Sequence, residues 1–110
     1  MIGFLNPQGE LIKCSSWEHL DKSTEICKDV YNKEFIYRQD AEDYILSVGY
    51  VAIRARDVYM SYKNETTNEW IKLTQKQLDF FATHADEFNE AQKKDICEIL
   101  YYQEGIRKRN

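Results

Sequence analysis

The stretch from Tyr50 to Tyr62 constrains the fold most, because its side chains alternate in character along the chain. One side of an extended chain would carry Val51, Ile53 and Ala55, and the other would carry Tyr50, Ala52, Arg54 and Arg56. Alternation resumes through Val58, Met60 and Tyr62. The pattern predicts two strands joined tightly near Arg56 and Asp57, or one long bent strand. It also predicts that Tyr50, Arg54 and Arg56 face outward.

The N-terminal segment predicts a second pair of strands. Apolar residues occur at 2–5 and 11–14, on either side of the turn sequence Asn6-Pro7-Gln8-Gly9. Proline at the second position of a turn presets φ, and glycine at the fourth suits the exit. We therefore expect a β-hairpin that pairs with the strands near 50–62. It should lie at a sheet edge, because proline is confined to edge positions.

Two helices are expected between these strand pairs. Ser15 and Glu18 have the spacing of a capping box, which predicts a helix continuing to about Asn32. Its inward stripe would be Trp17, Leu20, Thr24, Cys27, Val30 and Tyr31. Asp40 can cap a second helix that ends at Gly49. That helix would turn inward Ala41, Tyr44, Ile45 and Val48. Residues 34–39 fit either a short extended piece or a bent continuation of the first helix.

Two further capping boxes predict a pair of C-terminal helices after a polar loop at 63–68. Thr74 with Gln77 opens the third helix, and Asn89 with Gln92 opens the fourth, which Gly105 should end. The expected inward residues of the third helix are Leu78, Phe81, Ala82 and Ala85. Those of the fourth are Ile96, Ile99, Leu100 and Gln103, with Cys97 beside them. Their short connection favours an antiparallel αα-hairpin.

These elements give a single α+β domain over residues 1–106, in the order ββ-α-α-ββ-αα, followed by a frayed basic tail at 107–110. The chain has 110 residues, of which 43% are hydrophobic, which is enough for one core without stabilising disulfides or metal ions. No apolar run approaches the length of a membrane span, and the start does not resemble a signal peptide. Three widely spaced cysteines favour a reducing, cytoplasmic location.

Charge is spread unevenly over the chain. Residues 1–49 carry 5 basic and 9 acidic side chains, residues 50–78 carry 5 and 3, and residues 79–104 carry 2 and 7. The tail adds three basic residues, so the rest of the chain, the body, carries −7 within the total net charge of −4. Phosphates are repelled by such a body, which argues against generic nucleic-acid binding and favours a basic partner.

Catalytic chemistry has little support in the residues. Cys14 and His19 could form a nucleophilic pair, but no third residue that orients the histidine can be named. The spacing of Cys14, His19 and Cys27 matches no zinc pattern. Glycine-rich phosphate loops are absent from the sequence. We therefore expect no enzyme activity, no metal and no cofactor.

Two surfaces are candidates for partner binding. The first is basic and aromatic, on the central strands, and comprises Tyr50, Arg54, Arg56, Tyr59 and Lys63. The second is acidic, on the C-terminal helices, and comprises Asp79, Asp86, Glu87, Glu90, Asp95 and Glu98. Carboxylates spaced along a rigid helix pair could imitate a phosphate backbone toward a basic groove.

The segment GFLNPQGELIKC at 3–14, followed by Glu18 and His19, resembles the openings of small orphan proteins from phages and mobile elements of Gram-positive bacteria. Residues 43–51 are similar to the helix–glycine–strand middle of such proteins, and residues 73–78 to their ends. In size and charge the chain also resembles type II anti-CRISPR proteins, which inhibit Cas9. Those inhibitors share no common fold or motif, so the resemblance implies a context and assigns no site residue.

Together these features predict a non-enzymatic protein that inhibits a host defence nuclease by occupying its nucleic-acid-binding surface. The expected partner is Cas9 or its guide-RNA complex, in the bacterial cytoplasm. One alternative is a nucleic-acid-binding regulator that uses the basic and aromatic surface. The other is a small hydrolase or nuclease that uses Cys14 and His19.

Overall fold

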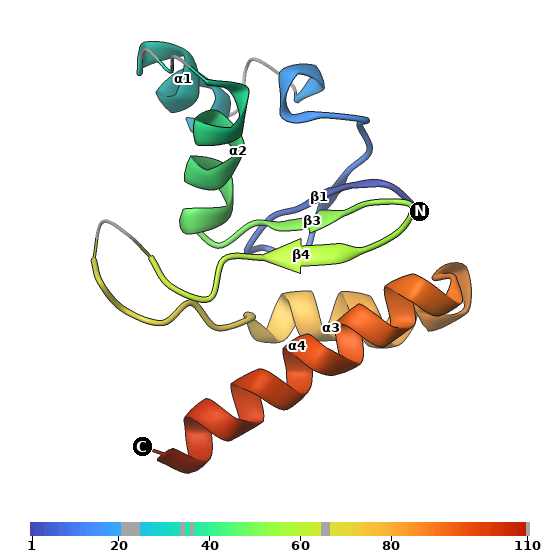
Figure 1. Cartoon of the computed structure of the whole chain (residues 1–110). Helices are drawn as coiled ribbons and strands as arrows, with labels where there is room; N and C mark the ends of the chain where they lie inside the picture. Colours follow the sequence, from blue (N-terminus) through green and yellow to red (C-terminus); the bar gives the residue numbers. More distant parts are fainter. Residues whose placement is uncertain (21–24, 34, 36, 65–66, 110) are drawn as a thin grey trace.

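The computed structural model describes residues 1–20, 25–33, 35, 37–64 and 67–109, with the backbone alone for residues 25, 27, 31 and 104–109. An antiparallel sheet of four strands, ordered β2-β1-β3-β4, lies between two layers of helices (Figure 1). The strands are β1 (Gly3–Leu5), β2 (Leu11–Ile12), β3 (Val51–Ile53) and β4 (Val58–Met60). The predicted α+β class and order of elements are therefore confirmed.

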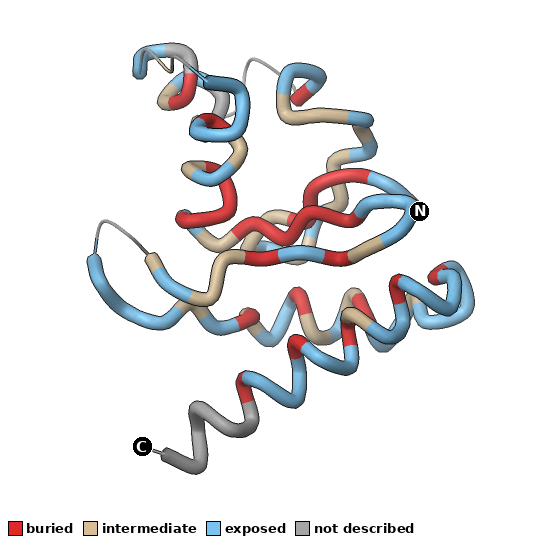
Figure 2. Tube along the Cα trace, viewed as in Figure 1, coloured by how far each residue is buried: buried red, intermediate tan, exposed pale blue. Residues whose placement is uncertain are grey.

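Helices α1 (Glu25–Asn32) and α2 (Arg38–Ser47) lie on one face of the sheet, with α1 packed against α2 and the short 3-10 turn η1 (Trp17–His19) beside them. Buried side chains from the strands and from the segments packed on them form the upper core: Phe4, Leu20, Val30, Ala41, Ile45, Leu46, Tyr50 and Ala52. Burial is concentrated on the strands and on the helix faces turned toward them (Figure 2).

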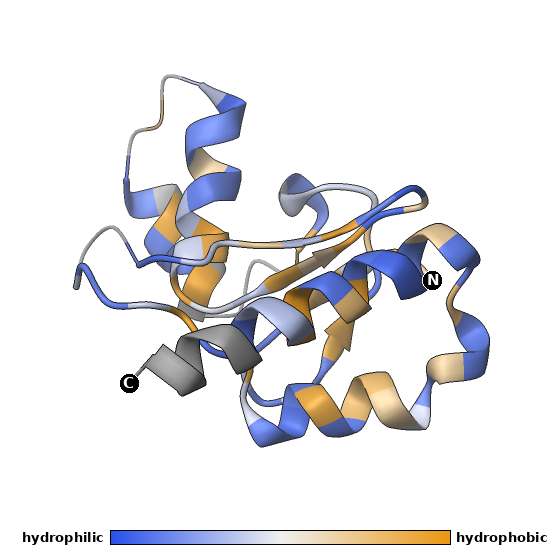
Figure 3. Ribbon diagram, turned by 60° about the horizontal axis from the view of Figure 1, so that its bottom comes forward, coloured by the Kyte–Doolittle hydropathy of each residue, from blue (hydrophilic) through white to orange (hydrophobic). Residues whose placement is uncertain are grey.

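The opposite face is covered by α3 (Gln75–Thr83) and α4 (Glu90–Arg109), joined through the short turn η2 (Ala85–Glu87). The two helices run in roughly opposite directions across this face of the sheet, as an αα-hairpin requires, and they lie in front of it in Figure 3. The lower core comprises Leu5, Val51, Ile53, Val58, Met60, Leu73, Phe81, Phe88, Ile96 and Ile99. Within the described residues, no helix combines the length and apolar character needed to cross a bilayer.

Both predicted hairpins are present. β1 pairs with β2 through Phe4 and Ile12, and the Gly9 amide donates to the Asn6 carbonyl at 2.9 Å. β3 pairs with β4 through Ala52 and Tyr59, and the Arg54 amide donates to the Asp57 carbonyl at 2.8 Å. The central stretch therefore forms two strands rather than one bent strand. β1 joins the hairpins by pairing with β3, which leaves β2 and β4 at the edges.

Both C-terminal capping boxes form as expected. The Gln77 amide donates to the Thr74 hydroxyl at 3.2 Å, and the Gln77 side chain accepts from the Thr74 amide at 2.9 Å. Asn89 and Gln92 make the equivalent pair of bonds, at 2.9 and 3.0 Å. These signals are local, since donor and acceptor lie three residues apart. These two signals therefore do not depend on contacts with distant parts of the chain.

The N-terminal helix starts differ from the prediction. The Ser15 hydroxyl lies 2.8 Å from His19 Nδ1, and Ser16, not Ser15, precedes the single turn of η1. A continuous helix from Ser15 is therefore wrong, and α1 begins at Glu25. Thr24 and the side chains of Cys27 and Tyr31 lie outside the described residues. Asp40 does not cap α2, because that helix begins at Arg38 and places Asp40 in its first turn.

Several inward positions also differ. Val48 is exposed after α2 ends, whereas Leu46 is buried. On α3, Ala82 and Ala85 beyond its end are exposed, whereas Gln77 is buried. On α4 the buried stripe is Gln92, Ile96, Ile99 and Gln103, which leaves Leu100 and Cys97 exposed. The helix continues through Gly105 to Arg109. A lone glycine within a helix costs only about 1 kcal/mol, so it does not force an end.

Candidate partner-binding surfaces

The predicted basic and aromatic surface is brought together only at Arg54 and Tyr59 among the described contacts. Tyr50 is 9% exposed and belongs to the upper core, so its predicted outward position is wrong. The side chains do alternate, but the upper layer packs on the face that the pattern predicts to be outward. A half-buried sheet shows alternation of this kind, whereas a sheet covered on both faces buries both sets of side chains.

The arginine at the centre of this surface is already neutralised. Arg54 forms ion pairs with Glu42 and, at 3.6 Å, with Asp57. Its guanidinium also lies 5.6 Å from the centre of the Tyr59 ring. Arg56 is exposed in the β3–β4 turn, and Lys63 follows the far end of β4. An extended chain puts those two residues about 20 Å apart, too far for one compact cationic site.

The predicted acidic residues divide into two groups. Asp86, Glu87 and Glu90 are exposed together at the connection between α3 and α4, and we call these three residues the acidic end. Residues 79–92 contain no lysine or arginine. Two of these carboxylates form only long ion pairs: Glu87 lies 3.8 Å from His84, and Glu90 lies 4.0 Å from Lys93. Asp79 is exposed on α3, where it accepts a hydrogen bond from Gln75.

Asp95 has a structural contact. Its carboxylate accepts a hydrogen bond of 2.9 Å from the Val58 amide. β4 is an edge strand, and Val58 opposes Ile53 in its pairing with β3. An edge strand leaves part of its backbone without a partner strand, and the α4 carboxylate satisfies one such donor. Asp95 therefore ties α4 to the sheet, and Glu98 is the residue of this group that is left exposed.

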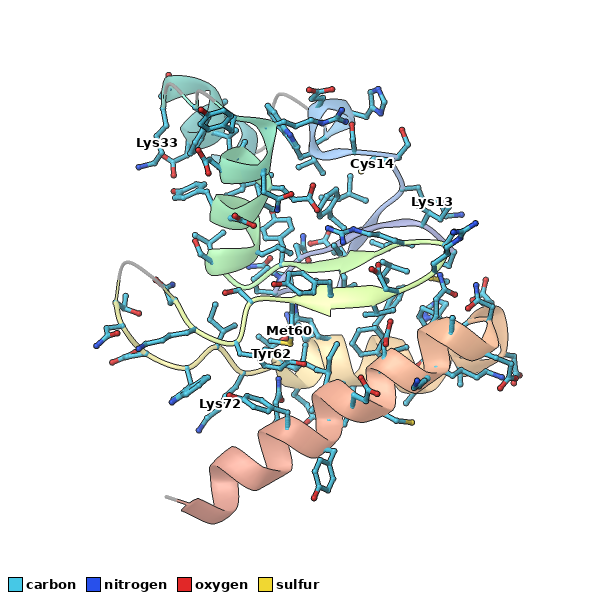
Figure 4. All side chains as sticks on the ribbon, viewed as in Figure 1. Lys13, Cys14, Lys33, Met60, Tyr62 and Lys72 are labelled. Atoms are coloured by element: carbon cyan, nitrogen blue, oxygen red, sulfur yellow. The ribbon has the colours of Figure 1, made fainter. Side chains whose placement is uncertain are left out.

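An aromatic groove that the sequence did not predict lies beside α4. It is a hollow of about 630 Å³ lined by Tyr62, Lys94, Cys97, Glu98, Tyr101 and Tyr102. Figure 4 shows Tyr62 just past β4, between the sheet and α4. The Tyr62 and Tyr102 ring centres are 4.2 Å apart, and Trp70 packs 5.7 Å from Tyr102. The groove is therefore built from residues about 40 positions apart in sequence.

The chain after β4 brings Trp70 into this cluster. Lys63 and Trp70 form an isolated antiparallel bridge, and the Ile71 amide donates to the Tyr62 carbonyl at 3.1 Å. Burial raises the pKa of Tyr62 above its ordinary value, and the nearby Glu98 carboxylate raises it further. The Tyr62 side of the groove is thus partly desolvated and lies near a carboxylate.

Cys14 and His19, the residues considered for catalysis, each contact a near neighbour in the chain. Cys14 Sγ lies 3.4 Å from the Ile12 carbonyl, while His19 contacts Ser15. Glu18, the nearest carboxylate in sequence, pairs with Arg38 at 3.5 Å. Over the described part of the chain, no group of three or more histidine, cysteine or acidic side chains could hold a metal ion.

Comparisons of this chain with protein-family models, with curated proteins and with solved structures find no match.

Proposed function

We propose that this protein binds a basic protein surface and acts as a non-enzymatic inhibitor of a bacterial defence nuclease. Cas9 and its guide-RNA complex are the partners to test first. The observation that carries the proposal is the acidic end: Asp86, Glu87 and Glu90 are exposed together at one helix junction. The nucleic-acid-binding surface of a nuclease is basic, so carboxylates held on rigid elements would compete there with phosphate.

The arrangement of the lower layer supports this role. The capping box of Asn89 and Gln92 fixes the start of α4, which places Glu90 at the junction. α3 and α4 are packed on the sheet through the lower core, so the carboxylates are held in place before a partner arrives. A preformed surface loses less conformational entropy on binding than a flexible one.

The test is binding to immobilised Cas9, with and without guide RNA, followed by a DNA-cleavage assay. Asp86→Asn combined with Glu87→Gln should slow association, with a smaller effect on dissociation, because exposed charges mainly steer encounter. Association of the original protein should fall as NaCl rises from about 50 to about 300 mM.

The matched control is Glu10→Gln combined with Glu69→Gln, which removes two exposed carboxylates elsewhere. This variant should associate almost as fast as the original protein. Absence of binding to Cas9 in both guide states would rule out the Cas9 version. Equal slowing by the two double variants would show that total charge matters and that the acidic end does not.

A further inference from the structure

The aromatic groove is an exposed apolar feature whose lining shares no residue with the acidic end. Three of the eight large hydrophobic side chains found exposed in the described residues, Trp70, Tyr101 and Tyr102, lie in or beside it. Tyr101 is 83% exposed and Trp70 is 49% exposed. Tryptophan and tyrosine are the residues most enriched at the energetic centres of protein interfaces. Their clustering therefore points to a contact surface.

The groove is preformed. Tyr62 follows a paired strand, Tyr102 belongs to α4, and the two rings pack 4.2 Å apart. Asp95, one helical turn before Glu98, holds α4 against β4 through the Val58 amide. An apolar side chain that enters this groove would gain contact area without the entropic cost of ordering the side chains that line it.

Charge in the groove indicates which ligand fits. Glu98 and Lys94 both line it, and neither has an ion-pair partner among the residues described. Burial raises the pKa of Tyr62, and the Glu98 and Asp95 carboxylates raise it further, so the side of the groove next to this ring is acidic, whereas Lys94 is a basic residue of the lining. A phosphate beside Tyr62 would meet the Glu98 carboxylate. A guanidinium could pair with Glu98 and also lie flat on a tyrosine ring.

We propose that the aromatic groove binds an apolar, arginine-containing segment of a protein partner, whose guanidinium pairs with Glu98 and stacks on a tyrosine of α4. The inference rests on the proposed function, because the same partner would be steered by the acidic end and held by the groove. The two surfaces would then control different rates: the acidic end sets association, and the groove sets dissociation.

The test uses a random peptide library displayed on phage, selected on the full chain with excess Tyr101→Ala protein as competitor. Recovered peptides should be enriched in arginine next to leucine or an aromatic residue. The most enriched peptide should bind the original protein and lose about tenfold or more in affinity toward Tyr101→Ala. Glu98→Gln should weaken the same peptide less and reduce the salt dependence of its binding.

Tyr37→Ala is the matched control, since Tyr37 is 68% exposed and precedes α2 on the other side of the sheet. It should leave peptide affinity unchanged. The proposal is overturned if no peptide discriminates against Tyr101→Ala, or if the enriched peptides are acidic. If the original protein binds a uridine oligonucleotide and Tyr101→Ala abolishes that binding, the groove is assigned to nucleic acid instead. If the original protein elutes as a dimer in gel filtration and Tyr101→Ala elutes as a monomer, the groove is assigned to a second copy of the chain.

The peptide experiment does not use Cas9, so the two proposals can fail separately. If peptides bind as expected and Cas9 does not, the groove is retained and the Cas9 partner is rejected. If Cas9 binds and Tyr101→Ala leaves its dissociation rate unchanged, the acidic end is retained and the groove is rejected.

Discussion

At the scale of single residues, two buried glutamines do more than cap helices. Gln77 donates through Nε2 to the Gly49 carbonyl at 2.9 Å, and Gln92 donates to the carbonyls of Met1 and Arg54 at 2.7 and 2.8 Å. Each side chain therefore closes a capping box and also ties a helix start to the end of a strand. Helix capping and the contact between the sheet and the lower layer depend on the same residues.

We expect Gln92→Ala to lower the free energy of unfolding by roughly 2 to 4 kcal/mol, because two carbonyls lose their donor and the Asn89 amide loses its acceptor. Urea unfolding followed by circular dichroism measures this change. Gln75→Ala is the control, since Gln75 is exposed on α3 and bonds only Asp79 among the contacts found. It should cost less than about 0.5 kcal/mol. Equal costs for the two variants would contradict the structural role of Gln92.

Tyr62 predicts a loss of stability in alkali. Burial and the nearby carboxylates raise the pKa of Tyr62, so above about pH 10 the folded state holds a proton that the unfolded state releases. Stability must therefore fall as pH rises through that range and is fully present below it. Tyr62→Phe should make the loss between about pH 9 and about pH 11 smaller, as measured by urea unfolding at each pH. Tyr37→Phe, at an exposed position, should leave the loss unchanged, and equal losses in all three proteins would refute the argument.

At the scale of elements, prediction from the sequence worked where the signal is short-range. Both C-terminal capping boxes, both hairpin turns and the positive φ of 102° at Gly49 depend on residues within a few positions of one another. The signature at Ser15 is equally short-range but does not form a cap, and the Ser15 hydroxyl contacts His19 Nδ1 instead. The aromatic groove could not be predicted, since Tyr62 and Tyr102 meet only after α4 packs against β4.

The N-terminal turn illustrates how an element depends on a distant one. Gly9 has a φ of 79°, and a Cβ placed there would lie 2.7 Å from the Lys76 carbonyl oxygen in the first turn of α3. The Thr74 hydroxyl, at the cap of the same helix, donates to the Pro7 carbonyl at 2.6 Å. The hairpin turn is thus packed directly on the start of α3. The sequence predicted the turn and the cap separately and gave no sign that they meet.

We expect Gly9→Ala to destabilise the protein more than Gly49→Ala. Both positions have positive φ, which costs an alanine about 1 kcal/mol or more. At Gly49 the nearest atom to an added Cβ is a proline side-chain carbon at 3.3 Å, whereas at Gly9 it is backbone of α3. The cost at Gly9 should therefore reach roughly 2 to 4 kcal/mol. Thermal unfolding of the two variants measures the difference, and equal costs would mean that the turn does not bear on α3.

At the scale of the whole molecule, one thin sheet separates two cores. β3 contributes Val51 and Ile53 to the lower core and Ala52 to the upper core, so neither layer is complete without it. The candidate surfaces are both in the lower layer: the acidic end lies at the start of α4, and the aromatic groove lies between α4 and Tyr62, which follows β4. Both candidate surfaces therefore depend on how the lower layer packs against the sheet.

Because the two cores share β3, we expect the protein to unfold as a single unit. Ile45→Ala in the upper core and Phe81→Ala in the lower core should each cost roughly 2 to 5 kcal/mol. Hydrogen exchange should show that Ile45→Ala lowers the protection of slow amides in α3 and α4 as much as it does in α2. Val48→Ala, at an exposed position just after α2, should change neither quantity appreciably. If Ile45→Ala lowered protection in the upper layer alone, the helices that carry both candidate surfaces would be an independently stable unit, and the upper layer would not be needed to hold them in place.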